Sequence, residues 1–130
     1  MAFRCTIVTP DEQAFDQQVE QVILPAHDGL VGILTNRAPL LMRIDAGPMQ
    51  IDLPGGRHAY YFVEGGVAQM RENQLTVITN TAIASTQISP AEAEAELQRA
   101  QAMPIEGPEN RQAKALALKR AHGKLAVAGK

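Results

Sequence analysis

The chain has 130 residues, of which 45% are hydrophobic and 20% charged, a balance typical of globular rather than disordered proteins. It contains no run of about 18 apolar residues, so direct insertion into a membrane is not expected. The net charge of −2 argues against a nucleic-acid partner. The start of the chain lacks the long apolar core of a signal peptide, and the lone cysteine permits no internal disulfide, so a reducing cytoplasm is expected.

Apolar and polar residues alternate from the start of the chain. Phe3, Cys5 and Ile7 alternate with Arg4 and Thr6, the period of a half-buried strand. Many short segments of strand-like composition follow at close spacing, which favours a flattened β-barrel or β-sandwich. These segments are residues 15–24, 49–53, 59–63, 67–70 and 75–79.

Residues 22–41 predict a compact corner with two chain reversals. The first strand of the corner is expected to stop at Pro25, which has no N–H to donate to a neighbouring strand. A turn at Asp28-Gly29 and another at residues 35–37 then bracket a second apolar run. Residues 38–42 are expected to return apolar side chains to the core. Further along, Gly65-Gly66 predicts either a β-bulge or a close approach of two backbones.

The pattern changes from strand to helix at Ser89. Ser89, Pro90 and Glu92 form a capping box, with a hydroxyl at the N-cap, proline at the first helical position and glutamate three residues after the serine. The first helix is expected to end near Met103, before Pro104, and a second helix is expected over residues 109–127. We therefore predict two domains, a β-sandwich over residues 1–86 and a helix-turn-helix over residues 87–130.

Both expected helices are rich in alanine and carry only narrow apolar stripes. The stripes comprise Ala93, Leu97 and Ala100 on the first helix, and Leu118, Ala121 and Leu125 on the second. Little apolar area would be buried by such stripes, so the helix pair is expected to dock on the sheets only weakly.

The charges are distributed unevenly between the two parts. Residues 1–88 hold five arginines and nine acids, a net charge of −4, whereas residues 89–130 hold seven basic and five acidic residues, a net charge of +2. Two interpretations of the basic second helix stay open. It presents either a solvated face that suits the helix dipole or an electrostatic contact for an acidic protein partner.

No group of residues has the pattern of a catalytic or metal site. His27 and His122 have no suitable carboxylate partner, and His58 is expected to be solvated beside a Gly-Gly hairpin. No pair of histidines or cysteines has metal-ligand spacing, and Cys5 is expected to fill the core. The glycine pairs do not open helices, so neither resembles a phosphate-binding loop. The sequence predicts neither an enzyme nor a bound metal.

The order of several segments identifies a family. A strand ending in Leu24-Pro25-Ala26 is followed by Asp28-Gly29, Gly32-Ile33-Leu34 and Ala38-Pro39-Leu40-Leu41. Residues 7–10, 61–67 and 73–78 continue the likeness. In their order and spacing, these segments resemble the epsilon subunit of rotary F-type ATP synthases, and the resemblance covers about residues 3–84 well.

This resemblance implies a non-catalytic rotor subunit at the cytoplasmic face of the cell membrane, held there peripherally by its complex. The sandwich would grip the gamma subunit and the ring of c subunits, and the helical hairpin would oppose ATP hydrolysis when it extends toward the beta and alpha subunits. The residues implied in ring contact are Asp28, Gly29, Leu30, Asn36 and Arg37. The residues that would contact the beta subunit are Arg111, Lys114, Lys119, Arg120 and Lys124.

The chain departs from the family pattern in two places. Leu30 and Arg37 stand where many relatives carry an acid and a histidine, so the ring contact would rest on Arg37 and backbone groups. Ser89 and Glu92 stand where ATP-binding relatives carry aspartate and arginine. We therefore expect no ATP binding and no other cofactor. A stand-alone β-barrel binding module or small enzyme, sharing only the fold, is the alternative, and co-purification with alpha, beta and gamma chains distinguishes the two.

Overall fold

The computed structural model describes residues 2–27 and 29–130, and within them the chain forms ten strands, one short 3-10 helix and two α-helices. The strands are β1 (Phe3–Val8), β2 (Gln13–Val19), β3 (Gln21–Ala26), β4 (Gly29–Leu34), β5 (Leu40–Arg43), β6 (Gly47–Leu53), β7 (Arg57–Glu64), β8 (Val67–Arg71), β9 (Gln74–Ile78) and β10 (Thr81–Ala84). The helices are η1 (Ser85–Gln87), α1 (Pro90–Gln101) and α2 (Pro108–Val127).

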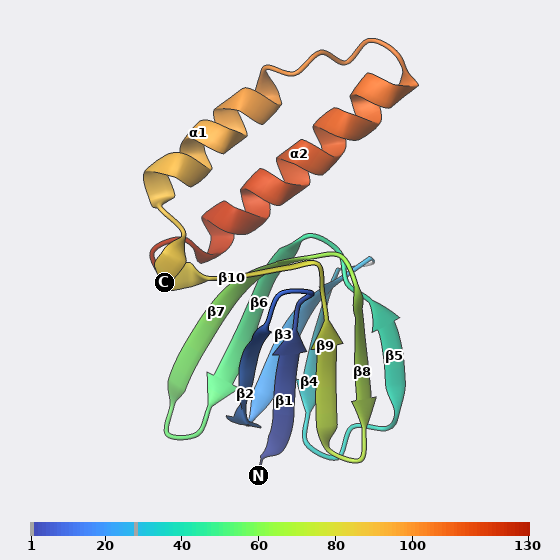
Figure 1. The fold of residues 1–130 in the computed structure, drawn as a ribbon, viewed down its shortest axis with the longest axis vertical. Coiled ribbons are helices and arrows are strands. Elements are labelled where there is room, and N and C mark those ends of the chain that lie inside the picture. Colours follow the sequence, from blue (N-terminus) through green and yellow to red (C-terminus); the bar gives the residue numbers. More distant parts are fainter. Residues whose placement is uncertain (1, 28) are drawn as a thin grey trace.

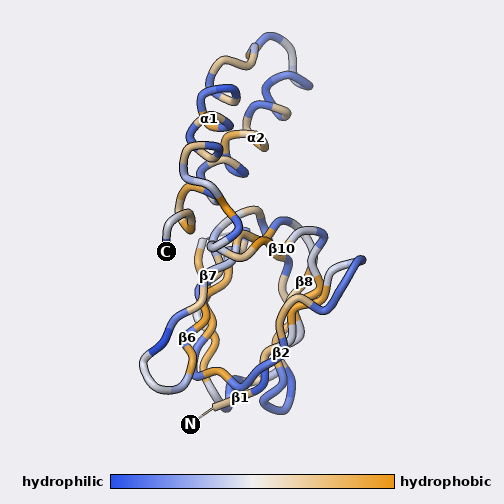
Figure 2. Tube along the Cα trace, turned by 60° about the vertical axis from the view of Figure 1, so that its left-hand side comes forward, coloured by the Kyte–Doolittle hydropathy of each residue, from blue (hydrophilic) through white to orange (hydrophobic). Residues whose placement is uncertain are grey.

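Two five-stranded sheets face each other in a sandwich, as the strand pattern predicted (Figure 1). The first sheet has the order β2-β1-β9-β8-β5 and the second has the order β10-β7-β6-β3-β4. Strands β1 and β9 pair in parallel, whereas the other recorded pairs are antiparallel. Buried apolar residues of both sheets form one cluster between them. Much of the strand trace is orange, the colour of hydrophobic residues, in Figure 2. On β1, for example, Phe3, Cys5 and Ile7 are buried, which confirms the alternation.

The expectation that the strand stops at Pro25 is wrong. β3 continues through Pro25 to Ala26, and Pro25 faces Leu30 of β4. Pairing with β6 covers only Gln21 to Ile23, so no ladder bond from a backbone N–H is needed at position 25. The carbonyl of Pro25 instead accepts a hydrogen bond from the N–H of Asp45 at 2.9 Å. A proline is tolerated here because no ladder pair with β6 is recorded at this position, although Gly47 of β6 lies close to the Pro25 ring.

Of two other local expectations, the one for Leu41 is wrong and the one for Gly65-Gly66 is confirmed. Leu41 does not return to the core, because β5 alternates and leaves this side chain 69% exposed while Leu40 and Met42 pack inward. Gly65 and Gly66 link β7 of the second sheet to β8 of the first, both with positive φ. A Cβ on Gly66 would lie 1.9 Å from the carbonyl oxygen of Ile78, so the interpretation as a close backbone approach is confirmed.

The helices form an antiparallel hairpin at the end of the sandwich where β10 runs (Figure 1). The hydroxyl of Ser89 accepts a hydrogen bond from the N–H of Glu92, as the capping box predicted. α1 ends at Gln101, two residues before the expected position. Ala93, Ala100 and Ala121 of the predicted stripes are buried, whereas the three leucines are half-buried. Neither helix in the described part of the chain is long and apolar enough to span a membrane.

Candidate functional site

The junction between α2 and the second sheet is a close contact of backbone on aromatic ring. Gly123 of α2 lies over Phe62 of β7 and beside Gly47 of β6. A Cβ on Gly123 would lie 2.8 Å from the Phe62 ring and 2.9 Å from the Gly47 Cα, closer than packed atoms approach. Phe62 and Val127 are fully buried here and, with Ala46, form a small apolar cluster separate from the core of the sandwich. The hairpin therefore docks through its own small contact.

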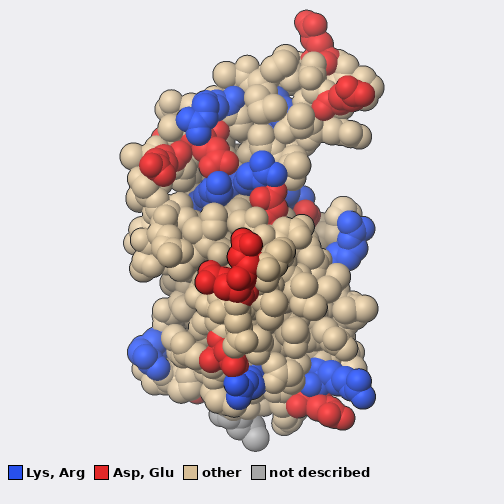
Figure 3. Space-filling view, in the orientation of Figure 1, with Lys and Arg blue, Asp and Glu red and all other residues tan. Residues whose placement is uncertain are grey.

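Two ion pairs flank this contact and join the basic helix to acids of the sandwich. Lys119 donates a hydrogen bond to Asp45, which lies between β5 and β6. Arg120 donates through Nε to the carboxylate of Glu64 on β7 at 2.7 Å. Basic and acidic side chains lie next to one another along this junction (Figure 3). Cations of the basic helix and acids of the sandwich therefore neutralise one another in part within the chain.

A third ion pair ties the two helices together. Lys124 of α2 donates to Glu96 of α1 at 3.0 Å, and its ammonium group also lies 5.6 Å from the centre of the Phe62 ring. Beside this pair is a hollow of about 130 Å³, lined in part by Ser89, Glu92 and Ala93 at the start of α1. The one basic side chain that lines this hollow, Lys124, is already paired with a carboxylate, which is a poor arrangement for holding phosphate.

These contacts shift the pKa values of Asp45 and Arg120. The hydrogen bond from Lys119 holds the pKa of Asp45 below its ordinary value, and the positive charge of Lys119 acts in the same direction. The hydrogen bond to Glu64 raises the pKa of Arg120 above its ordinary value. Both shifts favour the charged forms of Asp45 and Arg120.

The five basic residues predicted to contact the beta subunit all have partners within the chain. Lys119, Arg120 and Lys124 form the ion pairs above. Near the far end of the hairpin, the Lys114 ammonium group donates to the carbonyl of Gln101 at 2.9 Å, and the Arg111 guanidinium lies 3.5 Å from the carbonyl of Gly107. In this conformation three of the five cations are thus paired with carboxylates of the same chain, and Arg111 and Lys114 contact backbone carbonyls only.

The structure divides the predicted ring-contact residues into two groups at opposite ends of β4. Gly29 and Leu30 lie at the hairpin end, where they line a hollow shared with Lys119. Asn36 and Arg37 follow the other end of β4, where the N–H of Asn36 donates to Asn73 in the β8–β9 turn at 2.7 Å. From Leu30 to Leu34 the strand rises about 13 Å at roughly 3.3 Å per residue, and Asn36 follows two residues later. Asp28 lies outside the described residues.

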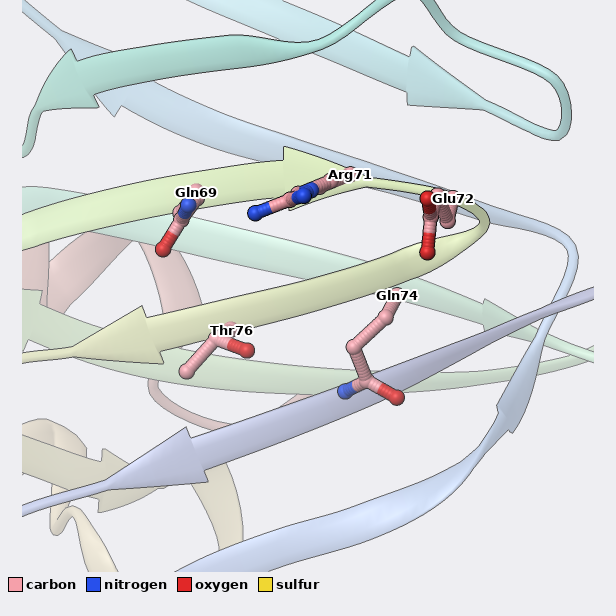
Figure 4. Close-up of a pocket in the computed structure, with 5 residues that line it drawn as sticks. All are labelled: Gln69, Arg71, Glu72, Gln74 and Thr76. Atoms are coloured by element: carbon pink, nitrogen blue, oxygen red, sulfur yellow. The ribbon is translucent and has the colours of Figure 1, made fainter.

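No arrangement typical of catalysis occurs in the described part of the chain. His58 pairs with Asp52 at 2.7 Å on an open strand surface. Cys5 is buried, and burial raises its pKa to about 12, so a thiolate is not available. A shallow hollow of about 390 Å³ on the outer face of the first sheet is lined by Gln69, Arg71, Glu72, Gln74 and Thr76, without an activated nucleophile (Figure 4). Residues 2–27 and 29–130 hold no cluster of potential metal ligands.

The sandwich side of the docking contact was not predicted from the sequence. Asp45, Glu64 and Phe62 are separated by many residues from α2, and no local pattern links them to it. Gly123 did carry a signal. A glycine inside a helix costs about 1 kcal/mol relative to alanine, so its presence within α2 indicated a position where another backbone or ring comes close.

The geometry defines a class of protein in which a β-sandwich carries a separately docked helical hairpin. Residues 2–85 match the family model of the "ATP synthase, Delta/Epsilon chain, beta-sandwich domain". The chain is 36% identical over 125 residues to an ATP synthase epsilon chain of Rhodopirellula baltica, which covers 96% of this chain and 97% of the relative. It is 37% identical over 134 aligned positions to an epsilon chain of Rippkaea orientalis, covering 99% and 98%.

Solved structures show the same fold at lower identity. A chain in the Euglena gracilis mitochondrial ATP synthase, in a structure of OSCP, F1 and c-ring, superposes with a TM-score of 0.87 at 19% identity, covering 96% of this chain and 80% of that one. A chain in the central stalk and c-ring structure of the Tetrahymena thermophila enzyme gives a TM-score of 0.66 at 13% identity, covering 95% and 92%. The chain described here belongs to the epsilon family of ATP synthase subunits and is a non-catalytic chain of that complex.

Proposed function

We propose that this subunit couples rotation of the membrane ring to the catalytic head and restrains ATP hydrolysis through its hairpin. The sandwich is the assembly part, and the hairpin is the part that moves. In this proposal the subunit stays peripheral, at the cytoplasmic face of the membrane, and the catalytic nucleotide sites belong to other chains of the complex.

One observation carries this proposal. The core of the sandwich draws its buried residues from the strands and the segment just before β6, whereas α2 docks through a separate, small cluster and two surface ion pairs. An interface of this kind can open without exposing the main core. It supports a division into an assembly domain, residues 1–86, and a regulatory hairpin, residues 87–130.

The outer face of the first sheet is the surface we propose for the gamma subunit. Exposed Val67 and Ile78 are paired across β8 and β9, and Leu41 stands next to Gln69 on the neighbouring pair. The hairpin docks on the second sheet and leaves this face, with its three exposed apolar side chains, uncovered. Apolar side chains that are exposed together on a sheet surface are typical of a protein interface.

The residues proposed for the ring contact form two groups, one at each end of β4. Leu30 and Gly29 offer an apolar turn beside the hairpin, and Arg37 and Asn36 offer a polar turn at the far end. Single cysteines at positions 30 and 37, tested for cross-linking to the polar loop of the c subunit, identify which turn meets the ring. If neither residue cross-links in an intact complex, the proposed ring contact is wrong.

The proposal as a whole is tested by reconstitution with alpha, beta and gamma chains. The full chain is expected to co-purify with them and to lower the ATPase activity of the soluble complex. Residues 1–86 alone are expected to fold, to bind the gamma chain and to leave the activity high. A truncated chain that binds and inhibits as well as the full chain would assign the inhibition to the sandwich instead.

A further inference from the structure

Strand β4 is an exposed edge of the second sheet. It pairs with β3 over six consecutive residues without a bulge, and no strand follows it in the sheet order. Successive residues of a strand direct their backbone N–H and C=O groups to alternate sides. Half of the backbone groups of β4 therefore serve β3, and the other half face outward.

Pro25 identifies which residues of β4 have free backbone groups. Its carbonyl accepts from Asp45, on the side away from β4, so the pair formed by Pro25 and Leu30 is not hydrogen-bonded. By alternation, Gly32 and Leu34 are in the same position as Leu30. The N–H and C=O groups of these three residues point to the open edge.

The same three residues form an apolar outer surface. Val31 and Ile33 pack toward the core, which places the side chains of Leu30 and Leu34 outward at 64% and 57% exposure. Gly32 lies between them and has no side chain to separate an approaching strand from the backbone.

This edge lacks the features by which sheet proteins prevent strand pairing. Edge strands are commonly protected by a charge, a proline, a bulge or short length. β5 contains Arg43, β2 contains Asp16, and β10 has only four residues. β4 has six residues, with no charge and no proline. A long, unprotected, apolar edge favours the addition of another strand.

We propose that β4 pairs with β4 of a second copy of this chain, antiparallel and centred on Gly32. A two-fold register centred on Gly32 sets each exposed leucine opposite a leucine of the other copy, so this edge is complementary to itself. In this register Gly32 faces the partner's Gly32, and Leu30 faces the partner's Leu34. The three residues with free backbone groups then meet one another, and the leucines pair on the outer face.

The dimer is the state of the unassembled chain and does not depend on the rotor function. It covers the strand whose two ends carry the proposed ring contacts, so pairing and assembly would exclude each other. Failure of the dimer experiment on the isolated chain would leave the reconstitution result untouched.

The test is the molar mass of the full isolated chain, measured by sedimentation over a range of concentrations up to about 1 mM. The wild type is expected to dimerise. Leu30→Lys with Leu34→Lys places like charges opposite each other across the two-fold axis and is expected to weaken the dimer at least about tenfold. Leu30→Glu with Leu34→Glu is expected to do the same, and an equimolar mixture of the two variants is expected to form a heterodimer.

A matched double variant on the other sheet, Leu41→Lys with Ile78→Lys, serves as the control and is expected to dimerise as the wild type does. All the substituted side chains are already exposed, so the fold is expected to be retained and circular dichroism checks it. A wild type that is monomeric throughout, or a dimer that the control disrupts and the β4 variants do not, overturns the proposal.

Discussion

Gly123 lies where α2 crosses Phe62, and the absence of a side chain sets the distance between them. Replacing it with alanine would place a Cβ 2.8 Å from the ring. Overpacking of this kind costs typically 1–3 kcal/mol, whereas alanine improves the intrinsic helix propensity by up to about 1 kcal/mol. The two effects have opposite signs, so the substitution separates docking from helix formation.

We expect Gly123→Ala to lower the hydrogen-exchange protection of α2 while the strands of the sandwich remain protected. His122→Ala, at an exposed neighbouring position, controls for the change in helix propensity and is expected to leave the protection of α2 unchanged or higher. Higher protection of α2 in Gly123→Ala would mean that the close contact with Phe62 does not limit the docking.

The thiol of Cys5 is expected to be unreactive in the folded chain. Its side chain is inaccessible, and burial, helped by the negative charge of Asp16, raises its pKa to about 12. At pH 8 the thiolate fraction is therefore negligible, and the folded chain is expected not to react with a thiol reagent such as Ellman's reagent. The same protein in guanidinium chloride is expected to react with one equivalent. A rapid reaction in the native state would show that β1 opens readily.

At the scale of elements, Asp45 and Glu64 hold the hairpin on the sandwich. Partly exposed ion pairs contribute up to about 1 kcal/mol each. Asp45→Asn with Glu64→Gln is therefore expected to lower the protection of α2 about 5–30-fold in the isolated chain. The effect should diminish at high salt. Glu72→Gln, in the turn far from the helices, is the control. Unchanged protection would show that apolar contacts alone hold the hairpin.

The pH dependence of this contact follows from the direction of the Asp45 shift. Its pKa is lowered in the folded chain, so its contribution is present above the ordinary aspartate pKa of about 3.9 and is lost as the pH falls through the lower folded value. We expect Asp45→Asn to differ from the wild type in α2 protection at neutral pH and to converge with it in acid. A difference that persists in acid would assign the effect to shape rather than charge.

Local patterns predicted the elements, and long-range contacts account for most of what was missed. Alternation identified β1, and the capping box identified the start of α1. The continuation of β3 through Pro25 was not predictable from the segment alone, because it depends on where β6 ends its pairing. The docking contact was missed for the same reason, since residues on β7 and α2 meet only in the folded chain. The turn after β4 was predicted and is confirmed at Thr35 and Asn36, whereas Asp28, in the turn predicted before β4, lies outside the described residues.

In the molecule as a whole, docking of the hairpin on the sandwich and its proposed contact with the beta subunit require the same basic side chains. Lys119 and Arg120 cannot remain paired with Asp45 and Glu64 while they contact an acidic surface on the beta subunit. The sandwich carboxylates thus oppose extension of the hairpin. Removing the carboxylates and removing the cations should therefore change the activity in opposite directions.

In the reconstituted soluble complex, we expect Asp45→Asn with Glu64→Gln to lower ATPase activity below that of the wild type, because the hairpin is released with its cations intact. Alanine at all five cations, Arg111, Lys114, Lys119, Arg120 and Lys124, is expected to raise the activity although it also loosens the docking. No single cation should dominate, because successive residues turn by about 100° and the five do not form one stripe. Steady-state hydrolysis with the subunit verified as bound is the measurement, and Glu72→Gln is the control. If both multiple variants raise the activity, the docked hairpin itself inhibits, and the proposed direction of the switch is reversed.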